Sequence, residues 1–113
     1  MPLKCEEYNN VCVVNLGADL SGEVPAELRK AIDERVEQRQ LVDFVVDFEK
    51  SGFVDSEGLE TLLWLKRRCE DLFGQVKLIN LDENCRKILE VTRLEHRFEC
   101  HNDLSAALKT MRC

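Results

Sequence analysis

The segment LVDFVVDF at residues 41–48 is the most apolar run of the chain, and after five further residues it is followed by VDSEGL at residues 54–59. We predict a buried strand in the first segment, a short loop, and a helix over residues 57–73. A helix N-terminus has unpaired N–H groups and a partial positive charge, so it favours the acidic and hydroxyl side chains of the second segment. The pattern therefore predicts a strand–loop–helix unit at the centre of the chain.

Four residues of this unit are candidates for function as well as for structure. Either Ser56 or Asp55 is suited to be the N-cap of the helix, and Glu57 then lies in its first turn. Gly58 has no side chain, so another backbone or a partner can approach it closely. The alternative is that these residues have no functional role and serve only to cap the helix and to allow its close packing. A phosphate-binding loop is not indicated, because there is no glycine-rich run followed by lysine.

The leucine-rich helix predicted over residues 57–73 has one apolar stripe, which Leu72 and Phe73 extend. Trp64 and Leu65 fall outside that stripe, so they meet either another helix of the domain or a partner. Gly74 is expected to end the helix.

Apolar spacing extends this alternation of strands and helices in both directions. Asn tolerates positive φ, so Asn9-Asn10 predicts a hairpin between two N-terminal strands, of which the second is apolar throughout. The other elements predicted by their periodicity are, in chain order, strands at 4–8 and 11–16, a helix from Pro25 to Arg39, a strand at 76–81, a helix capped by Asp82 or Asn84, a strand at 98–100 and a final helix capped by Asn102.

Alternating strands and helices predict an α/β fold with right-handed crossovers. We expect one domain over residues 1–113, with a mixed, mainly parallel sheet of about five strands and four helices. A chain of 113 residues can bury a core of its own.

The composition excludes several classes of function. The formal net charge of −6 gives no basic footprint for nucleic acid or for an anionic membrane. No apolar run approaches the roughly 18 residues of a membrane-spanning helix, and the first residues lack the apolar core of a signal peptide. We therefore expect a cytoplasmic protein without membrane insertion, and a monomer.

The cysteines are read as free thiols that serve mainly as small buried apolar side chains. No pair has C-x-x-C spacing, and a disulfide framework is typical of short secreted chains. His96 and His101 lie near only one cysteine, Cys100, so we expect no metal site and no cofactor. The six cysteines are Cys5, Cys12, Cys69, Cys85, Cys100 and Cys113.

The Asp-Ser-x-Gly-Leu block after an apolar strand resembles the STAS domain, and in particular the bacterial anti-sigma-factor antagonists. The resemblance covers essentially the whole chain. Its most specific residues are 45–48, 53–59, 62–63 and 67–68, with further support from 76–78, 88–89, 92–94, Phe98 and 107–108.

The resemblance implies a function in partner switching. In that family the loop reads Asp-Ser-Ser-Gly or Asp-Ser-Thr-Gly, and an anti-sigma kinase phosphorylates the hydroxyl residue directly before the glycine. The unphosphorylated antagonist binds the kinase and releases the sigma factor. By position Asp55, Ser56 and Gly58 match, but Glu57 stands at the acceptor position. The implied partner is an anti-sigma factor or a related histidine-kinase-like ATPase-domain protein, and no catalysis by this chain is implied.

Two further departures from the family accompany Glu57. The family often has Gly-x-Leu-Asp after the second strand, where this chain has Ala18-Asp19-Leu20-Ser21, and Arg93 stands where glycine often precedes leucine. We expect the partner to contact residues 53–58, the exposed side of the following helix, and residues 17–22 with Asp19 and Ser21.

Glu57 has two interpretations. A phosphoserine carries about −1.5 to −2 charges and three acceptor oxygens, whereas glutamate carries one charge and two oxygens. The helix dipole that would favour a phosphate also favours glutamate, so Glu57 is either a phosphate mimic or only a good first-turn residue. We predict that it prevents phosphorylation and that Ser56, as the N-cap, faces the helix amides.

Two other functions remain possible on the sequence. The STAS family also includes small subunits of lipid-transport ATPases. An enzyme or phosphotransfer protein could use Asp47 and Asp55 at strand ends to hold Mg²⁺. No spacing suggests a pair of base and nucleophile for such an enzyme.

Overall fold

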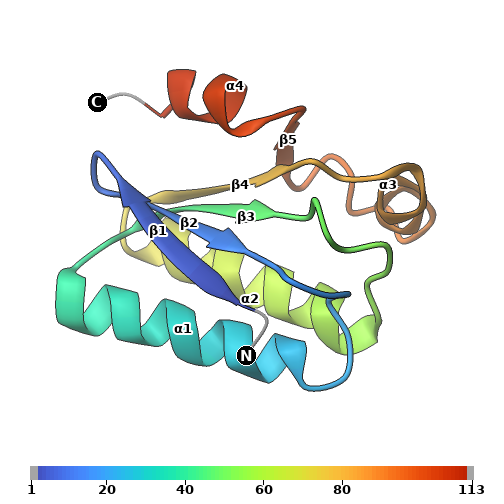
Figure 1. Ribbon diagram of the computed structural model, residues 1–113, viewed down its shortest axis with the longest axis horizontal. Coiled ribbons are helices and arrows are strands. Elements are labelled where there is room, and N and C mark those ends of the chain that lie inside the picture. The colour runs from blue at the N-terminus through green and yellow to red at the C-terminus, as the bar shows by residue number, and fades with distance from the viewer. Residues whose placement is uncertain (1–2, 112–113) are drawn as a thin grey trace.

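The computed structural model describes residues 3–111, which form one five-stranded sheet with the strands in sequence order, β1-β2-β3-β4-β5 (Figure 1). Four helices accompany the sheet, so the predicted α/β class is confirmed. The elements are β1 (Lys4–Tyr8), β2 (Val11–Asn15), α1 (Val24–Arg39), β3 (Asp43–Asp47), α2 (Ser56–Asp71), β4 (Gln75–Ile79), α3 (Glu83–Val91), β5 (Glu99–His101) and α4 (Leu104–Lys109).

The sheet is parallel except for the N-terminal hairpin. β1 pairs antiparallel with β2, and β2, β3, β4 and β5 pair in parallel. Asn9 and Asn10 have φ values of 49° and 69°, the left-handed region that a two-residue hairpin turn requires. The predicted hairpin and its turn are therefore confirmed.

Helices cover both faces of the sheet unequally. α1 and α2 lie side by side on one face, while the short α4 lies over the other (Figure 1). β2 is buried on both sides: Cys12 and Val14 belong to the larger core, and Val11 and Val13 belong to the smaller core under α4. This explains why the strand has no polar alternation in the sequence. No helix within residues 3–111 has the length and apolarity needed to cross a membrane.

The C-terminus of α2 differs from the prediction. Phe73 takes the left-handed position with φ 61° and its side chain is 97% exposed, so it does not extend the apolar stripe. The N–H groups of Phe73 and Gly74 bond to the carbonyls of Glu70 (3.1 Å) and Cys69 (2.7 Å), which is a Schellman motif. Gly74 does not itself terminate the helix. A Cβ atom at Gly74 would lie 1.9 Å from the Val42 carbonyl oxygen, so glycine is needed for close packing there.

The structure decides where Leu65 and Trp64 pack, which the sequence left open, and it corrects one predicted N-cap. Leu65 is fully buried, because α2 packs against α1 as well as the sheet and so buries a wider stripe. Trp64 is half-buried under the guanidinium of Arg29 from α1, 5.2 Å from its ring centroid, so it meets a helix of the same domain. The N-cap of α4 is Asp103 and not Asn102, because the Asp103 carboxylate accepts a hydrogen bond from the Ala106 amide (2.8 Å).

Candidate functional site

Two loops at the carboxyl ends of β2 and β3 lie along each other like a short continuation of the sheet. The Leu20 amide donates to the Phe53 carbonyl (2.9 Å), and the Asp55 amide donates to the Leu20 carbonyl (3.2 Å). Leu20 and Val54 form an isolated parallel bridge. The backbone of the loop after β2 is thus fixed directly against the segment that leads into α2.

Side chains extend this pairing toward the sheet. The Asp19 carboxylate accepts a hydrogen bond from the Gly52 amide (2.8 Å), and the Ser51 hydroxyl donates to the Ala18 carbonyl. From the first turn of α3, the Asn84 side chain donates to the Gly52 carbonyl (2.7 Å). The loop after β2, the loop after β3 and the first turn of α3 are therefore joined at one end of the sheet, although these bonds link residues more than thirty positions apart.

Asp55 connects the loop and the helix. One carboxylate oxygen accepts from the Gly58 amide at 2.7 Å, which makes Asp55 the N-cap of α2. The other oxygen accepts from the Gly22 amide at 3.2 Å, in the loop after β2. The expectation that Ser56 caps the helix is wrong, because Asp55 occupies that position and Ser56 is the first helical residue, with an exposed side chain.

Gly58 allows the close approach between the first turn of α2 and the loop after β2. A Cβ atom at this position would lie 2.4 Å from the Leu20 carbonyl oxygen and 2.8 Å from Val54 Cγ1. Gly58 is buried and its own chain fills the space beside it. Of the two readings of this glycine, close packing within the domain is the one that the contacts support.

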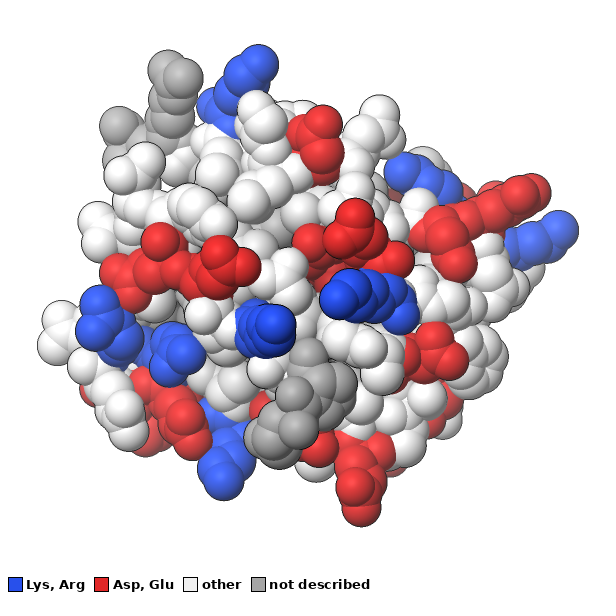
Figure 2. Space-filling model, in the orientation of Figure 1, with Lys and Arg blue, Asp and Glu red and all other residues white. Residues whose placement is uncertain are grey.

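Glu57 lies in the first turn of α2 with an exposed side chain. Other carboxylates lie on the same three joined segments, where Asp55 is half-buried and the others are exposed. We call this region the acidic edge; it consists of Asp19, Glu23, Asp55, Glu57, Asp82 and Glu83. On the face drawn in Figure 2, acidic and basic groups are interspersed and no continuous basic patch is present.

Phe53 and Ser21, which both lie in the predicted contact segments, differ in their exposure. Phe53 precedes the acidic motif and is 46% exposed, which gives the acidic edge an apolar neighbour. Ser21, a predicted contact residue, is half-buried, and its carbonyl accepts from the Val24 amide (3.1 Å) at the start of α1. The sequence placed both residues in the contact surface but contains no signal for their exposure, because that depends on how the loops pair.

The carboxylates proposed for magnesium are engaged with protein groups. Asp47 Oδ1 accepts from the Glu49 amide (2.9 Å) and from the Asn80 side chain (3.0 Å), whereas both oxygens of Asp55 hold the backbone of the acidic edge. Within residues 3–111 no three histidine, cysteine or acidic side chains are placed to bind a metal ion. This geometry gives the magnesium hypothesis no support.

Comparison with known proteins gives concordant matches. The sequence pattern of the family described as STAS domain matches residues 3–107. The anti-sigma F factor antagonist of Paenibacillus polymyxa is 26% identical over 111 residues, which are 98% of this chain and 84% of that protein.

Solved structures agree on the fold. A Thermotoga maritima protein proposed to be an anti-sigma factor antagonist superposes with a TM-score of 0.91 at 14% identity, over 98% of this chain and 95% of the other. The phosphorylated form of SpoIIAA, a cell fate determinant of Bacillus, superposes with a TM-score of 0.75 at 22% identity, over 97% and 99% of the two chains. At these identities the structural likeness establishes the fold alone.

Proposed function

The chain belongs to the STAS domain family, and on that premise we propose that it is a non-catalytic module that binds an anti-sigma factor or a related histidine-kinase-like ATPase-domain protein. The similarity to an anti-sigma F factor antagonist over 98% of the chain supports this partner class. In this proposal residues 1–113 form one domain that acts in the cytoplasm as part of a partner-switching pathway.

One structural observation carries the proposal: the predicted contact residues lie on two segments that are bonded to each other. Asp19 and Ser21 lie on the loop after β2. Asp55, Ser56, Glu57 and Gly58 form the N-cap and the first turn of α2, and hydrogen bonds join the two segments. A preorganised surface binds more tightly than a mobile one, because less conformational freedom is lost on association. The acidic edge is therefore suited to dock a partner as a unit.

The charge of the acidic edge defines the chemistry of that partner. Exposed carboxylates on three joined segments favour a surface rich in arginine and lysine, and such complementarity speeds encounter and rejects acidic competitors. Phe53 adds an apolar contact at the margin of this surface. We infer that the partner presents basic side chains to the first turn of α2 and an apolar pocket to Phe53.

Glu57 gives this module a permanent negative charge. At the same position the family has a hydroxyl residue, whose charge changes when it is phosphorylated. Asp55 already satisfies the Gly58 amide, so Glu57 is not needed as a cap and its carboxylate is available to a partner. We infer that partner binding is independent of phosphorylation, with the Glu57 carboxylate as part of the contact.

The partner class is tested by capture and reconstitution. Tagged wild-type protein is incubated with lysate of the source organism, bound proteins are identified by mass spectrometry, and the main one is purified and mixed with the chain. We expect a protein with a histidine-kinase-like ATPase domain that co-elutes with the chain in gel filtration. A reconstituted complex with a lipid-transport ATPase, or with a protein that lacks an ATPase domain, would overturn the proposal.

A further inference from the structure

The N-terminal hairpin brings two cysteines of adjacent strands into contact. In the register of β1 and β2, Cys5 pairs with Val14 and Cys12 pairs with Glu7, so the two thiols are diagonal neighbours on one face. After a two-residue turn these are the non-hydrogen-bonded pairs, whose side chains approach most closely. Cys5 packs against the core cluster to which Cys12 belongs.

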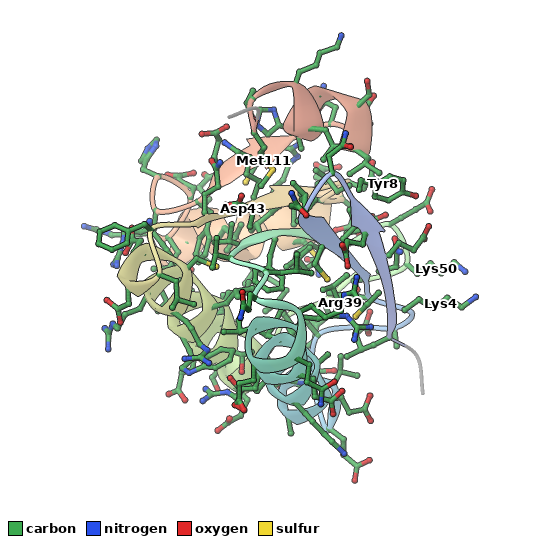
Figure 3. All side chains as sticks on the ribbon, turned by 90° about the vertical axis from the view of Figure 1, so that its left-hand side faces the viewer. Lys4, Tyr8, Arg39, Asp43, Lys50 and Met111 are labelled. Atoms are coloured by element: carbon green, nitrogen blue, oxygen red, sulfur yellow. The ribbon has the colours of Figure 1, made fainter. Side chains whose placement is uncertain are left out.

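A cation from α1 completes the cluster. The face that carries Cys5 and Cys12 belongs to the core that α1 covers, and the positive charge of Arg35, on α1, acts to lower the pKa of both thiols. Among the described residues no ion pair ties Arg35 to a carboxylate. In Figure 3 the hairpin stands beside α1, and Arg39 of the same helix marks the contact through its ion pair with Glu7 (2.8 Å).

The surroundings make the two thiols chemically unequal. The interaction with Cys12 and the charge of Arg35 lower the pKa of Cys5 below its usual range, against the opposing effect of burial. The same interaction and burial raise the pKa of Cys12, so Cys12 keeps its proton. By contrast, burial raises the pKa of Cys69 and of Cys85 to about 12.

Access also differs between the two thiols. Cys5 is half-buried on the edge strand, whereas Cys12 is only 1% exposed in the core. A reagent from solvent therefore meets Cys5 first, and Cys12 lies behind it. Because β1 is an edge strand, a shift of its backbone that brings the two sulfur atoms to disulfide geometry breaks no pairing with a further strand.

We propose that Cys5 and Cys12 form a peroxide-reactive site in which Cys5 is the attacking thiolate, Cys12 is the resolving thiol and Arg35 holds the thiolate. The Cys5 sulfur attacks one oxygen of hydrogen peroxide, the O–O bond breaks, and the departing hydroxide takes up a proton to become water. This leaves Cys5 as a sulfenic acid. The Cys12 sulfur then attacks the Cys5 sulfur, the S–O bond breaks, and the oxygen leaves as a second water with the Cys12 proton.

This site is separate from the acidic edge, so it goes beyond the proposed function and does not depend on it. The thiolate is the reactive form of cysteine, and a cationic neighbour is the usual way in which proteins stabilise it near neutral pH. The inference rests on the register that places two cysteines as diagonal neighbours on one face of the hairpin, one half-buried and one in the core, and the partner surface uses neither of them.

The test uses reduced full-length protein treated with equimolar hydrogen peroxide at pH 6, followed by alkylation and peptide mapping. We expect the loss of two hydrogen atoms per chain and one peptide that links Cys5 to Cys12. With iodoacetamide at pH 6, Cys5 should react at least about tenfold faster than Cys69 or Cys85, because its thiolate fraction is far higher.

Variants separate the roles of the three residues. Cys12→Ser should accumulate a Cys5 sulfenic acid that dimedone traps, Arg35→Gln should slow the reaction of Cys5 at pH 6, and Cys69→Ser should behave as wild type. If a variant fails to fold, peptide mapping of the peroxide-treated wild type still tests whether Cys5 and Cys12 form a disulfide. Peroxide oxidation confined to other cysteines, or a Cys5 that reacts no faster than Cys69, would overturn the proposal.

Discussion

Gly74→Ala should lower the free energy of unfolding by about 3 kcal/mol or more, the largest effect that we expect from a single methyl group in this chain. The added Cβ would lie 1.9 Å from the Val42 carbonyl oxygen and 2.6 Å from its carbonyl carbon. These are backbone atoms at the entry to β3, so no side-chain rotation relieves the overlap. Either the turn between α2 and β4 or the entry to β3 has to move, and the two strands that follow these points are paired with each other in the sheet.

The matched control is Gly52→Ala. A Cβ atom there would lie 3.4 Å from an Asp82 carboxylate oxygen, an ordinary contact with a side chain, so the midpoint of urea unfolding should remain near that of wild type. Urea unfolding followed by circular dichroism measures both variants. Equal midpoints for the two variants would show that the close approach of Gly74 to Val42 is not as described.

Glu57→Lys should weaken binding of the captured partner by about tenfold or more, since it places a cation opposite a basic surface at the centre of the acidic edge. The same change puts a positive charge at a helix N-terminus, which costs about 0.3–1 kcal/mol of stability and leaves the fold intact. Asp55, which makes the structural bonds, remains in place. Isothermal titration with the purified partner measures the loss.

Glu37→Lys is the control for this change. Glu37 is an exposed carboxylate near the C-terminal end of α1, at the opposite end of the sheet from the acidic edge (Figure 1). Its replacement by lysine changes the net charge of the chain by the same amount as Glu57→Lys. Its affinity for the partner should match that of wild type at physiological salt, where charges far apart are screened. A loss of equal size in both variants would mean that net charge, and not the acidic edge, determines binding.

The sequence predicted the elements well because their signals are local. The alternation of apolar runs and helical spacing needs no knowledge of distant residues, and the turn at Asn9-Asn10 and the cap at Asp82 follow from the side chains present. The site was predicted in part for the same reason: an acidic first turn of α2 can be recognised from its own residues.

The contacts that unite the site are long-range and could not be predicted in this way. Asp55 and Ser56 are both good caps in isolation, and the choice of Asp55 follows from its second bond, to the Gly22 amide 33 residues away. Phe73 is apolar and in phase with the stripe of α2, yet the close packing of Gly74 against Val42 leaves Phe73 at the exposed left-handed position. In each case tertiary packing overrides a local preference.

The correction at Ser56 also changes the argument about phosphorylation. Because Ser56 is exposed and Asp55 caps the helix, Ser56 is not shielded by a capping bond. Only its position now disfavours phosphorylation of Ser56, because it lies one residue before the acceptor position that Glu57 occupies. A kinase that places its nucleotide against residue 57 would have to bind the chain one residue out of its usual position to phosphorylate Ser56.

The most direct test is the intact mass of the wild-type chain after incubation with its partner kinase and ATP. Glu57→Ser is treated in parallel to show whether the kinase can modify a hydroxyl at that position. We predict that the mass of wild type does not change and that the chain remains bound to the kinase. One phosphate per wild-type chain, located on Ser56, would contradict the account and would establish a phosphorylation switch displaced by one residue.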